Sequence, residues 1–500
     1  MSLDAVSVGI MWDRLVAISD EIVTTLVRTS FSTIVSESYD LTVALLDADG
    51  QLMAQGTYSV PVFMGTAPAT LQHMLARYPA ESLRPGDVII TNDPWLGTGH
   101  MFDINVMRPV FHDGRIVAYV ISITHLPDIG GLGFGAAARE IYHEGLRLPV
   151  CKLFEAGVQN DFIIELMRTN VRAPDQVIGD LMANVTATKV GEAMLTGFLV
   201  EYGLADFASL SQEIRGRSET ATRARISAMP DGSYHNEIQI EGVDGALTLA
   251  CHIDVAGDAM TVDFAGTDGC VRQGINVPFC YTRAMVLYSM KCLTVPELPN
   301  NGGSVVPITV TAPAGCLLDA QPPSPTGARH MIGHFVSPLV FGALAGLDGA
   351  ETTPGPSNMA VVPIEVWETL TSTTVERKYL LPDTGGAGAS RGGLGQEVVI
   401  RNDSGHVMTV FCMANRTDFP PLGLMGGGNG KPREHRINDV TVDPKGHYEL
   451  EPGDRITMIE AGGAGYGDPA LRPREAIELD LAEGFVTPEG AARDYGFNGE

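Results

Sequence analysis

Residues 104–124 read INVMRPVFHDGRIVAYVISIT, and this stretch decides how the first half of the chain is expected to fold. Two apolar runs flank Asp113 and Gly114, and an Asp-Gly pair between such runs predicts a β-hairpin with a two-residue loop. If these two residues form the loop, the numbers of facing residues sum to 227, so Asp103 is expected to face Thr124. The hairpin therefore brings the segment before residue 104 next to the segment after residue 124.

The segments around this hairpin predict an α+β fold. A second Asp-Gly pair, Asp49 and Gly50, predicts another hairpin with strands at 41–46 and 51–54. Apolar periodicity predicts further elements of the first half, which are helices at 3–28, 68–78 and 161–202 and a strand at 88–91. For the second half it predicts strands at 235–241, 247–255, 260–264, 397–401, 407–413 and 455–459, and helices at 279–293, 336–347 and 473–483. We expect a mixed α/β region, 1–225, that carries the candidate site, and a strand-rich region, 226–500, with interrupting helices and a helical C-terminal tail.

Composition excludes several classes of protein. The 500 residues carry a formal net charge of -27, and such a field repels nucleic acid and anionic lipid headgroups. Apolar residues at 44% and charged residues at 19% are typical of a globular protein. We find no export signal and no segment that would span a membrane, and the seven cysteines, without a CxxC pair, favour reduced thiols. The expected location is the cytoplasm.

The densest group of possible ligands lies at the open end of the central hairpin. His100 and Asp103 precede its first strand, and His125 and Asp128 follow its second. If the ladder were regular down to residue 100, the two histidines would lie on one face and Asp103 on the other. The stretch from 100 to 103 is therefore expected to be irregular, and the loop-forming residues Pro94, Gly97 and Gly99 favour this.

Two imidazoles with one or two carboxylates form a mixed nitrogen and oxygen site that suits Zn, Mn or Fe. A metal in such a site lowers the pKa of bound water or polarises a carbonyl. The alternative is structural: His100 would cap the loop, His125 would be a core histidine, and Asp103 and Asp128 would form turns.

Other motifs are weaker evidence for a binding or catalytic site. The segment 426–431, GGGNGK, resembles a phosphate-binding loop, but Met425 and Pro432 stand where the Walker A pattern requires Gly and Ser or Thr. The glycine-rich segments 383–395 and 462–468 could wrap an anion, yet close-packed turns require the same glycines, and we favour turns. There is no GxSxG elbow and no cysteine with a basic partner set, so covalent catalysis is not predicted.

Several motifs together resemble the hydantoinase B and 5-oxoprolinase B-type subunits, to which the large subunits of acetone and acetophenone carboxylases are related. The resemblance covers nearly the whole chain. It rests on Ser38-Tyr-Asp40, Asn92-Asp-Pro94 through Gly99-His-Met-Phe-Asp103, His125 with Asp128-Ile-Gly-Gly131, Glu144-Gly-Leu146, Pro322-Pro323 with Gly327-Ala-Arg329, and Gly462-Gly-Ala-Gly-Tyr-Gly-Asp-Pro469. It implies a metal site formed by Asp40, His100, Asp103 and His125. Beside these we place Asp128, as an orienter of a histidine, and Glu144, as a proton shuttle.

The resemblance also implies a partner and a reaction. The partner is an A-type subunit of actin-like fold that binds ATP with Mg, in a hetero-oligomer. ATP would activate the carbonyl of a cyclic amide such as a hydantoin, 5-oxoproline or another lactam, and a metal-bound hydroxide would then open the ring. Two alternatives stay open: the metal-bearing subunit of an ATP-dependent ketone carboxylase, and an assembly subunit without catalytic activity.

Overall fold

A computed structural model describes residues 4–242, 245–345, 373–412, 414–443 and 445–498. They fall into two compact units. The first comprises residues 1–231, 255–262 and 269–333, and the second comprises 232–254, 263–268 and 334–500. The boundary expected at 225/226 lies close to the first change of unit, but the sequence did not indicate that the chain returns to the first unit twice.

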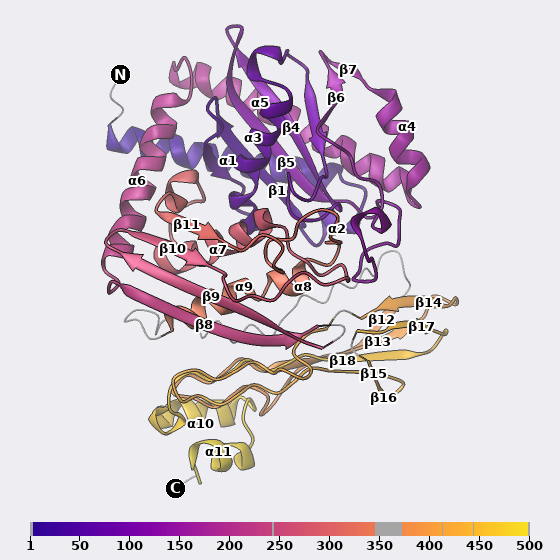
Figure 1. Cartoon of the computed structure of the whole chain (residues 1–500), viewed down its shortest axis with the longest axis vertical. Helices are drawn as coiled ribbons and strands as arrows, with labels where there is room; N and C mark the ends of the chain where they lie inside the picture. Colours follow the sequence, from indigo (N-terminus) through magenta and orange to yellow (C-terminus); the bar gives the residue numbers. More distant parts are fainter. Residues whose placement is uncertain (1–3, 243–244, 346–372, 413, 444, 499–500) are drawn as a thin grey trace. The chain divides into compact units, whose positions relative to one another are not determined.

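A seven-stranded sheet is the centre of the first unit (Figure 1). Its strand order is β2-β1-β5-β4-β3-β6-β7. The strands are β1 (Leu41–Asp47), β2 (Leu52–Gln55), β3 (Val88–Thr91), β4 (Asp103–His112), β5 (Arg115–His125), β6 (Cys151–Glu155) and β7 (Val158–Gln159). All seven residues of β1 and nearly all of β4 and β5 are buried, so both faces of the central strands are covered. Both predicted hairpins and the strand at 88–91 are confirmed.

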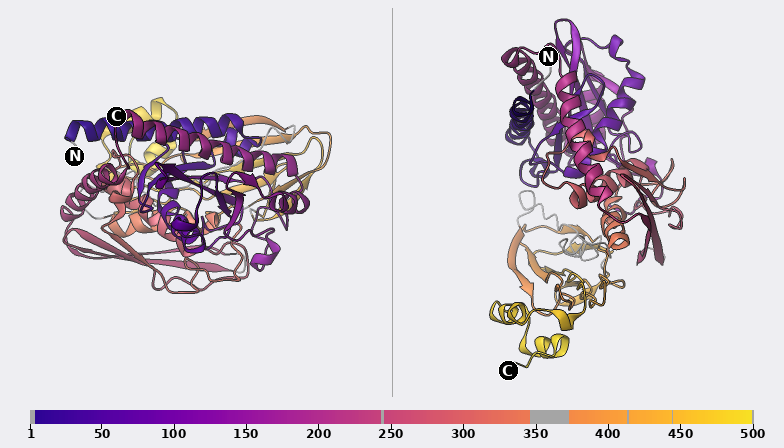
Figure 2. Two further views of the ribbon diagram at one scale, coloured as in Figure 1. Left: turned by 90° about the horizontal axis from the view of Figure 1, so that it is seen from above. Right: turned by 90° about the vertical axis from the view of Figure 1, so that its left-hand side faces the viewer.

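Two long helices, α1 (Ala5–Thr29) and α5 (Pro174–Tyr202), lie side by side on one face of this sheet (Figures 1 and 2). Alternate residues of β1, namely Leu41, Val43 and Leu45, pack against them in one apolar cluster. The helical prediction over 161–202 is confirmed except at residues 171–173, where α4 (Asp161–Asn170) has ended and α5 has not yet begun. Pro174 is the physical reason, since a proline disfavours helical dihedrals at the residue before it and suits the first turn of a new helix.

Helix α6 (Ala208–Ser227) was not predicted, although it packs on α1 and β2. Its buried stripe contains Leu210, Ile214 and Ile226 but also Ser218 and Thr222. The small polar members interrupt the apolar period that would have indicated a helix.

The first unit also contains shorter helices and turns. They are the helices α2 (Thr33–Ser36), α3 (Ala67–Arg77), α7 (Phe279–Thr294) and α8 (His330–Gly333), and the short 3₁₀ turns η1 (Pro61–Gly65), η2 (Ala80–Ser82), η3 (Ile141–His143) and η4 (Gly302–Val305). Gly65 allows η1 to approach α7 closely, because a Cβ there would lie 2.8 Å from the Cα of Ala284. The predicted helices at 68–78 and 279–293 are confirmed.

The pairing of β4 with β5 contains a β-bulge that changes the predicted register. Asp113 and Gly114 form the loop, both with positive φ, and Phe111 faces Ile116 as expected. Val117 is then an extra residue of β5, so Val110 faces Ala118 and the numbers of facing residues sum to 228 from there to the open end. Asp103 therefore faces His125, and the prediction that it faces Thr124 is wrong by one residue.

Strands dominate the rest of the chain. A four-stranded sheet has the order β11-β10-β9-β8, with β8 (Gly232–Glu241), β9 (Ala246–Ala256), β10 (Ala259–Asp263) and β11 (Ile308–Thr311). A five-stranded sheet has the order β12-β13-β18-β15-β16, and β14 pairs with β17. Their bounds are β12 (Thr373–Leu381), β13 (Gly395–Asn402), β14 (Met408–Phe411), β15 (Glu434–Ile437), β16 (Val440–Val442), β17 (His447–Leu450) and β18 (Arg455–Ile459). The helices of the second unit are α9 (Val336–Leu344), α10 (Arg474–Ala482) and α11 (Pro488–Tyr495), with the 3₁₀ turn η7 (Pro469–Leu471).

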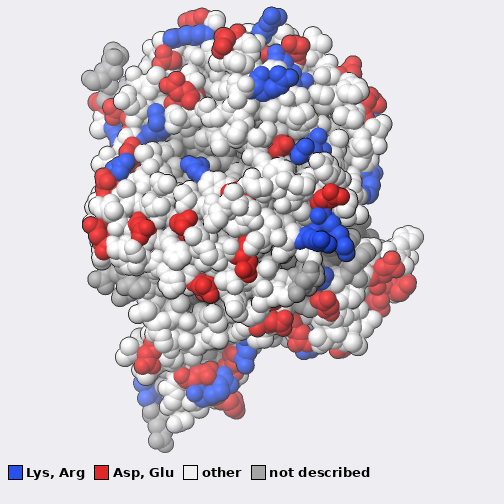
Figure 3. All heavy atoms as spheres, viewed as in Figure 1, with Lys and Arg blue, Asp and Glu red and all other residues white. Residues whose placement is uncertain are grey.

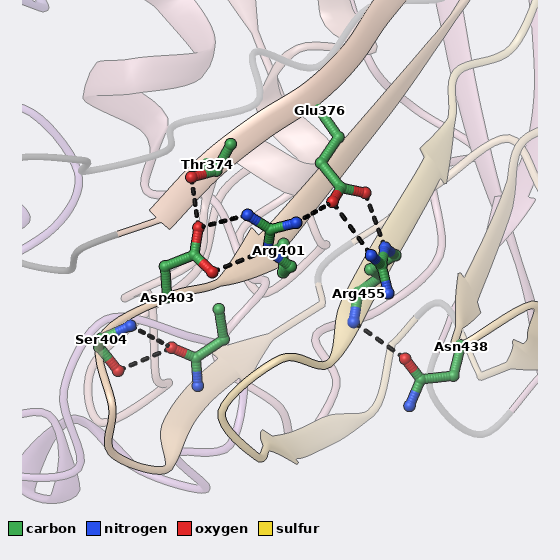
Figure 4. A network of polar contacts seen from close by, with 8 residues as sticks. Thr374, Glu376, Arg401, Asp403, Ser404, Asn438 and Arg455 are labelled. Atoms are coloured by element: carbon green, nitrogen blue, oxygen red, sulfur yellow. Dashed lines mark hydrogen bonds and ion pairs between the residues drawn. The ribbon is translucent and has the colours of Figure 1, made fainter.

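The strands and helices predicted for the second half are confirmed, except that residues 346–347 of one helix and residue 413 of one strand lie outside the described residues. An exposed polar network joins three strands of the five-stranded sheet (Figure 4). Glu376 of β12 accepts hydrogen bonds from Arg401 of β13 and Arg455 of β18, at 2.5 and 2.7 Å. These arginines hold the pKa of the Glu376 carboxyl below its usual value.

Three glycine-rich segments of the second unit pack main chain against main chain. Residues 384–394, 421–431 and 460–467 are joined by backbone hydrogen bonds in every pairing, such as Gly386 N to Gly463 O (2.7 Å), Gly428 N to Ala387 O (2.7 Å) and Gly465 N to Gly428 O (2.8 Å). A Cβ at Gly462 or Gly465 would overlap a neighbouring carbonyl. The glycines therefore allow these extended segments to approach each other closely, and we call the three segments the glycine array. The sequence favoured turns here, and turns alone do not describe this packing of backbones.

All seven cysteines are free thiols. Among the described residues, no helix is long and apolar enough to cross a membrane. On the face drawn in Figure 3, acidic and basic side chains are interspersed.

Candidate functional site

The bulge of β5 places Asp103 and His125 opposite each other at the open end of the central hairpin. Facing residues of a ladder point to the same side of the sheet, so the conflict of faces expected from the regular register does not arise. His125 N also donates to the carbonyl of Asp40, 3.2 Å away, on the other side of β5. Asp40 directly precedes β1, at the level of His125, and follows Tyr39, whose φ of 54° is uncommon for an aromatic residue.

An irregular loop, 92–102, carries His100 to the same place, as predicted. Asn92 fixes this loop: its Nδ2 donates to the carbonyls of Met101 (2.8 Å) and Leu146 (3.0 Å), and its Oδ1 accepts from Leu148 N (2.6 Å). Gly99 adopts a φ of 94°, and a Cβ there would meet the Arg329 side chain. Glycine is therefore required by both conformation and space.

Asp103 is a buried carboxylate held between two partners. Its Oδ2 lies 3.0 Å from His100 Nε2 and 2.9 Å from Arg329 Nη2, and only 1% of the residue is exposed. Burial alone would raise the pKa of Asp103, but the close contact with His100 and the charge and hydrogen bond of Arg329 outweigh burial and hold this pKa well below its usual value. The Arg329 guanidinium also donates to Thr98 O at 2.6 Å and stacks on the Tyr281 ring, 4.0 Å from its centroid. Asp103 is therefore ionised, and its position is fixed.

His100 directs an electron pair toward this carboxylate. Its Nδ1 lies 3.3 Å from Gly327 O, where it donates in the neutral tautomer, which leaves Nε2 without a proton. Burial and the charge of Arg329 lower the pKa of His100, so the neutral ring is favoured. Within the described part of the chain Nε2 makes no hydrogen bond, although it lies 3.0 Å from Asp103 Oδ2. Two acceptors at this distance favour a cation between or beside them.

His125 has two buried nitrogens without a hydrogen-bond partner among the residues that the structure describes. Its ring stacks on Phe102 (5.1 Å between centroids) and lies 5.2 Å from the rings of His100 and Phe134. Burial lowers the pKa of His125 to about 3, so the ring is neutral near pH 7. Leaving such polar atoms unsatisfied costs about 1–3 kcal/mol, and this site therefore suits a ligand that accepts a nitrogen lone pair.

Glu144 contacts the site indirectly, through the backbone of residues 326 and 327. Its Oε1 accepts from Thr326 N (2.5 Å) and Gly327 N (2.7 Å), and Gly327 is the residue whose carbonyl meets His100. Its Oε2 is buried and has no hydrogen-bond partner in the described ranges. Burial raises the pKa of Glu144 from its usual 4.5 to about 7, and the backbone hydrogen bonds only partly oppose this.

Asp128 has different contacts from those predicted. Its carboxylate accepts hydrogen bonds from Gly130 N and from the backbone N–H and guanidinium of Arg172. The expected interaction with a histidine is not among them. Asp128 instead fixes the loop after β5 to the junction between α4 and α5.

Sequence reasoning gave no role to two residues that the structure places here. Arg329 approaches Asp103 from 226 positions away in the chain, and its only signal was its place in the GAR motif. Phe134 packs its ring against His125 and stacks on His330, with 5.2 Å between centroids in both cases. It stands in a glycine-rich stretch that carried no periodic signal.

The chemical types of these ligand atoms therefore suit a divalent transition metal. The neutral imidazoles of His100 and His125 and the ionised Asp103 are nitrogen and oxygen ligands, and Asp40 ends the loop next to His125. Among the described residues, no three His, Cys, Asp or Glu side chains form a group already arranged to hold a metal ion. The unpartnered nitrogens of His125 are the observation that favours one.

Comparisons with known proteins agree on one family. A family model described as hydantoinase B/oxoprolinase matches residues 4–353 and 341–469. The B-type chain of a putative D-/L-hydantoinase from Pseudomonas sp. (strain NS671) is 27% identical, over 99% of this chain and 95% of the relative. The beta subunit of the caprolactamase from Pseudomonas jessenii is 26% identical, over 99% and 96%.

Two solved structures share the fold. The ATP-dependent caprolactamase of Pseudomonas jessenii superposes with a TM-score of 0.88 at 24% identity, over 99% of this chain and 96% of that chain. A nucleotide-free acetone carboxylase superposes with a TM-score of 0.85 at 16% identity, over 98% and 79%.

Proposed function

This chain belongs to the hydantoinase B/oxoprolinase family, and on that premise we propose that it is the metal-bearing B-type subunit of an ATP-dependent hydrolase of cyclic amides. The names of its relatives, which include a B-type hydantoinase chain, the beta subunit of a caprolactamase and 5-oxoprolinase, support a hydrolase-type enzyme subunit that works with a partner subunit. The open end of the central hairpin is the proposed reaction centre. The single observation that carries the proposal is His125, a buried neutral imidazole for whose two nitrogens the described residues offer no hydrogen-bond partner.

We assign His100, His125, Asp103 and Asp40 as the residues that hold the metal. A divalent metal bound there would polarise a carbonyl or lower the pKa of a bound water. The protein's part is to hold the ligands in place: Gly327 O fixes the tautomer of His100, and Arg329 fixes the Asp103 carboxylate. Phe102 and Phe134 exclude water from the imidazole of His125.

Glu144 has the properties of a proton carrier near neutral pH. With a pKa of about 7, its carboxyl is present in both forms, and Oε2 is the oxygen that takes or releases the proton, because Oε1 accepts two backbone hydrogen bonds. The same two bonds hold residues 326–327 against His100. Glu144 is therefore both a proton carrier and a positioning residue in the proposed site.

ATP and Mg are assigned to the partner. An unstrained amide is a poor electrophile, and transfer of a phosphoryl group to its oxygen would make the carbonyl carbon easier to attack. In this chain the segment that resembles a phosphate loop lies in the glycine array. Its N–H groups at Gly427, Gly428 and Gly430 donate to backbone carbonyls and are not free to bind phosphate. The proposed partner is an A-type subunit that binds ATP.

Two alternative functions predict different products. A ketone carboxylase would incorporate labelled bicarbonate into an acid; the acetone carboxylase comparison, at 16% identity, supports the fold and not this reaction. An assembly subunit without catalytic activity would keep full activity in the complex when Asp103 is changed to Ala. The unpartnered imidazole of His125 favours a ligand-binding site over that last possibility.

Metal content of the purified chain is the direct test. Inductively coupled plasma mass spectrometry should find about one transition metal per chain, and the double change His100→Ala and His125→Ala should remove it. His112→Ala is the matched control, because His112 is the last residue of β4, at the far end of the hairpin. With the A-type subunit, ATP and Mg²⁺, phosphate release should be coupled to ring opening on a panel of lactams. Metal retained by the double variant, or phosphate release never coupled to ring opening, would contradict the proposal.

A further inference from the structure

Helix α5 buries a stripe of polar side chains against the central sheet. Asp180, Asn184 and Thr188 recur every four residues, so they lie on one face of the helix, and all three are fully buried. Burying polar groups costs free energy unless they are hydrogen-bonded, so apolar residues would pack a helix on a sheet at lower cost. A polar network whose members are hydrogen-bonded instead rigidifies the segments that it joins.

Asp180 holds the segment that leads to Asp40. Its Oδ1 accepts hydrogen bonds from Phe31 N (2.7 Å) and Ser32 N (3.1 Å), directly before α2. A carboxyl oxygen that accepts from two successive backbone N–H groups fixes the chain at that point. Helix α2 in turn holds Asp40, whose N–H donates to Ile34 O at 3.1 Å. Asp180 therefore fixes the start of a short segment that ends at a proposed metal ligand.

Asn184 holds the strand that ends at His125. Its Oδ1 accepts from Ser122 Oγ (2.5 Å), and its Nδ2 donates to Thr124 Oγ1 (2.8 Å) and to Asp180 O (2.8 Å). Thr124 and His125 are successive residues of β5, so their side chains point to opposite faces of the sheet. Asn184 therefore fixes β5 from the face opposite to the imidazole of His125.

We propose that Asp180 and Asn184 are positioning residues of the candidate metal site, an inference that rests on the proposed function. The two segments that they hold meet where His125 N donates to Asp40 O, at 3.2 Å. A shift of either segment would change the separation of the two ligand side chains. Residues that orient metal ligands in this way affect metal affinity by about tenfold to a hundredfold.

The affinity of the full-length chain for Zn²⁺, measured by competition with a chromogenic chelator, tests this inference. Asp180→Ala and Asn184→Ala should each weaken Zn²⁺ binding about tenfold or more. Asp180→Asn keeps an oxygen acceptor for both N–H groups and should restore most of the affinity. Thr188→Val is the matched control, because the hydroxyl of Thr188 contacts Val185 O and Arg108, which belong to neither segment. It should change the affinity by less than about twofold.

Double-mutant cycles separate positioning from a general loss of stability. If Asp180 acts through Asp40, Asp180→Ala should have no further effect on Zn²⁺ affinity in a chain that carries Asp40→Ala. Asn184→Ala should likewise have no further effect in a chain that carries His125→Ala. Additive effects in these cycles, natural affinity in both alanine variants, or an equal loss in Thr188→Val would overturn the inference.

Hydrogen exchange by mass spectrometry on the metal-free chain gives a readout that needs no bound metal. Asp180→Ala should speed exchange in residues 34–41, and Asn184→Ala in residues 121–126, by about tenfold, whereas Thr188→Val should change neither. Unchanged exchange in the two alanine variants would overturn the inference. A natural chain that binds no Zn²⁺ would instead contradict the proposed function, and exchange would still decide whether Asp180 and Asn184 hold these two segments.

Discussion

Replacing Glu144 by Gln should change the stability of the first unit relative to the natural chain, and this change should favour the variant more at high pH than at low pH. We expect this although the change removes a charge that two backbone N–H groups contact. The folded state raises the pKa of this carboxyl from 4.5 to about 7. Between these values the folded state binds more protons than the unfolded state, so the stability of the natural chain falls as pH rises. Glu144 should therefore cost the first unit about 2–3 kcal/mol between pH 5 and pH 8.

The Gln variant lacks this titration and keeps an oxygen for the two N–H groups. Its stability relative to the natural chain should thus rise by about 2–3 kcal/mol over the same interval, whatever constant cost the new amide nitrogen adds. The assay is hydrogen exchange by mass spectrometry against urea concentration, read on peptides from β4 and β5, at both pH values. Glu140→Gln is the control, since Glu140 is exposed on the same loop. A pH-independent difference for Glu144→Gln, or the same small effect for both variants, would refute the reasoning.

Three further predictions concern stability. Gly462→Ala should destabilise the second unit by about 3 kcal/mol or more, because the new methyl group overlaps a carbonyl, whereas Gly393→Ala, with open space at its Cα, should be nearly neutral in urea unfolding. Arg329→Gln should cost about 3–5 kcal/mol by leaving Asp103 buried without its cation, and a double-mutant cycle with Asp103→Asn should recover part of that loss. His435 is buried and neutral, and its pKa is lowered to about 4 by burial and then by Arg433. The second unit should therefore lose stability as pH falls from 6.5 to 4, because the unfolded state takes up the proton first. In thermal unfolding at pH 7 and pH 4, His435→Phe should remove up to about 3 kcal/mol of this loss.

Local sequence signals were sufficient for the hairpins of the first unit. Asp49-Gly50 and Asp113-Gly114 each specify a tight turn between apolar runs, and both turns form where they were expected. Helix α1 was predicted because its buried stripe is apolar except for Ser19, and α6 was missed because Ser218 and Thr222 are among the several polar residues of its shorter apolar stripe. These signals describe the apolar pattern within one helix or strand and the turn that joins it to the next element along the chain.

The candidate site depends on features that such signals do not contain. The bulge at Val117 changes which residue faces Asp103, and β-branched Val117 is as regular a strand residue as its neighbours. Arg329 reaches Asp103 through tertiary folding, and the hydrogen bonds of Asp128 to Arg172 depend on where α4 ends. Sequence therefore predicted which residues gather at the hairpin's open end, but not which of them touch.

The glycine array has a consequence for the order in which the second unit folds. Glycine loses more backbone entropy on ordering than any other residue, and the fully buried apolar side chains of the array, Ala461 and Ala464, are small. Strands β13 and β18, which adjoin its first and third segments, pair with each other and place those segments in register, as the bond from Glu460 N to Gln396 O shows. We therefore expect the five-stranded sheet to form first. The glycine array should then assemble late, on strands that are already paired.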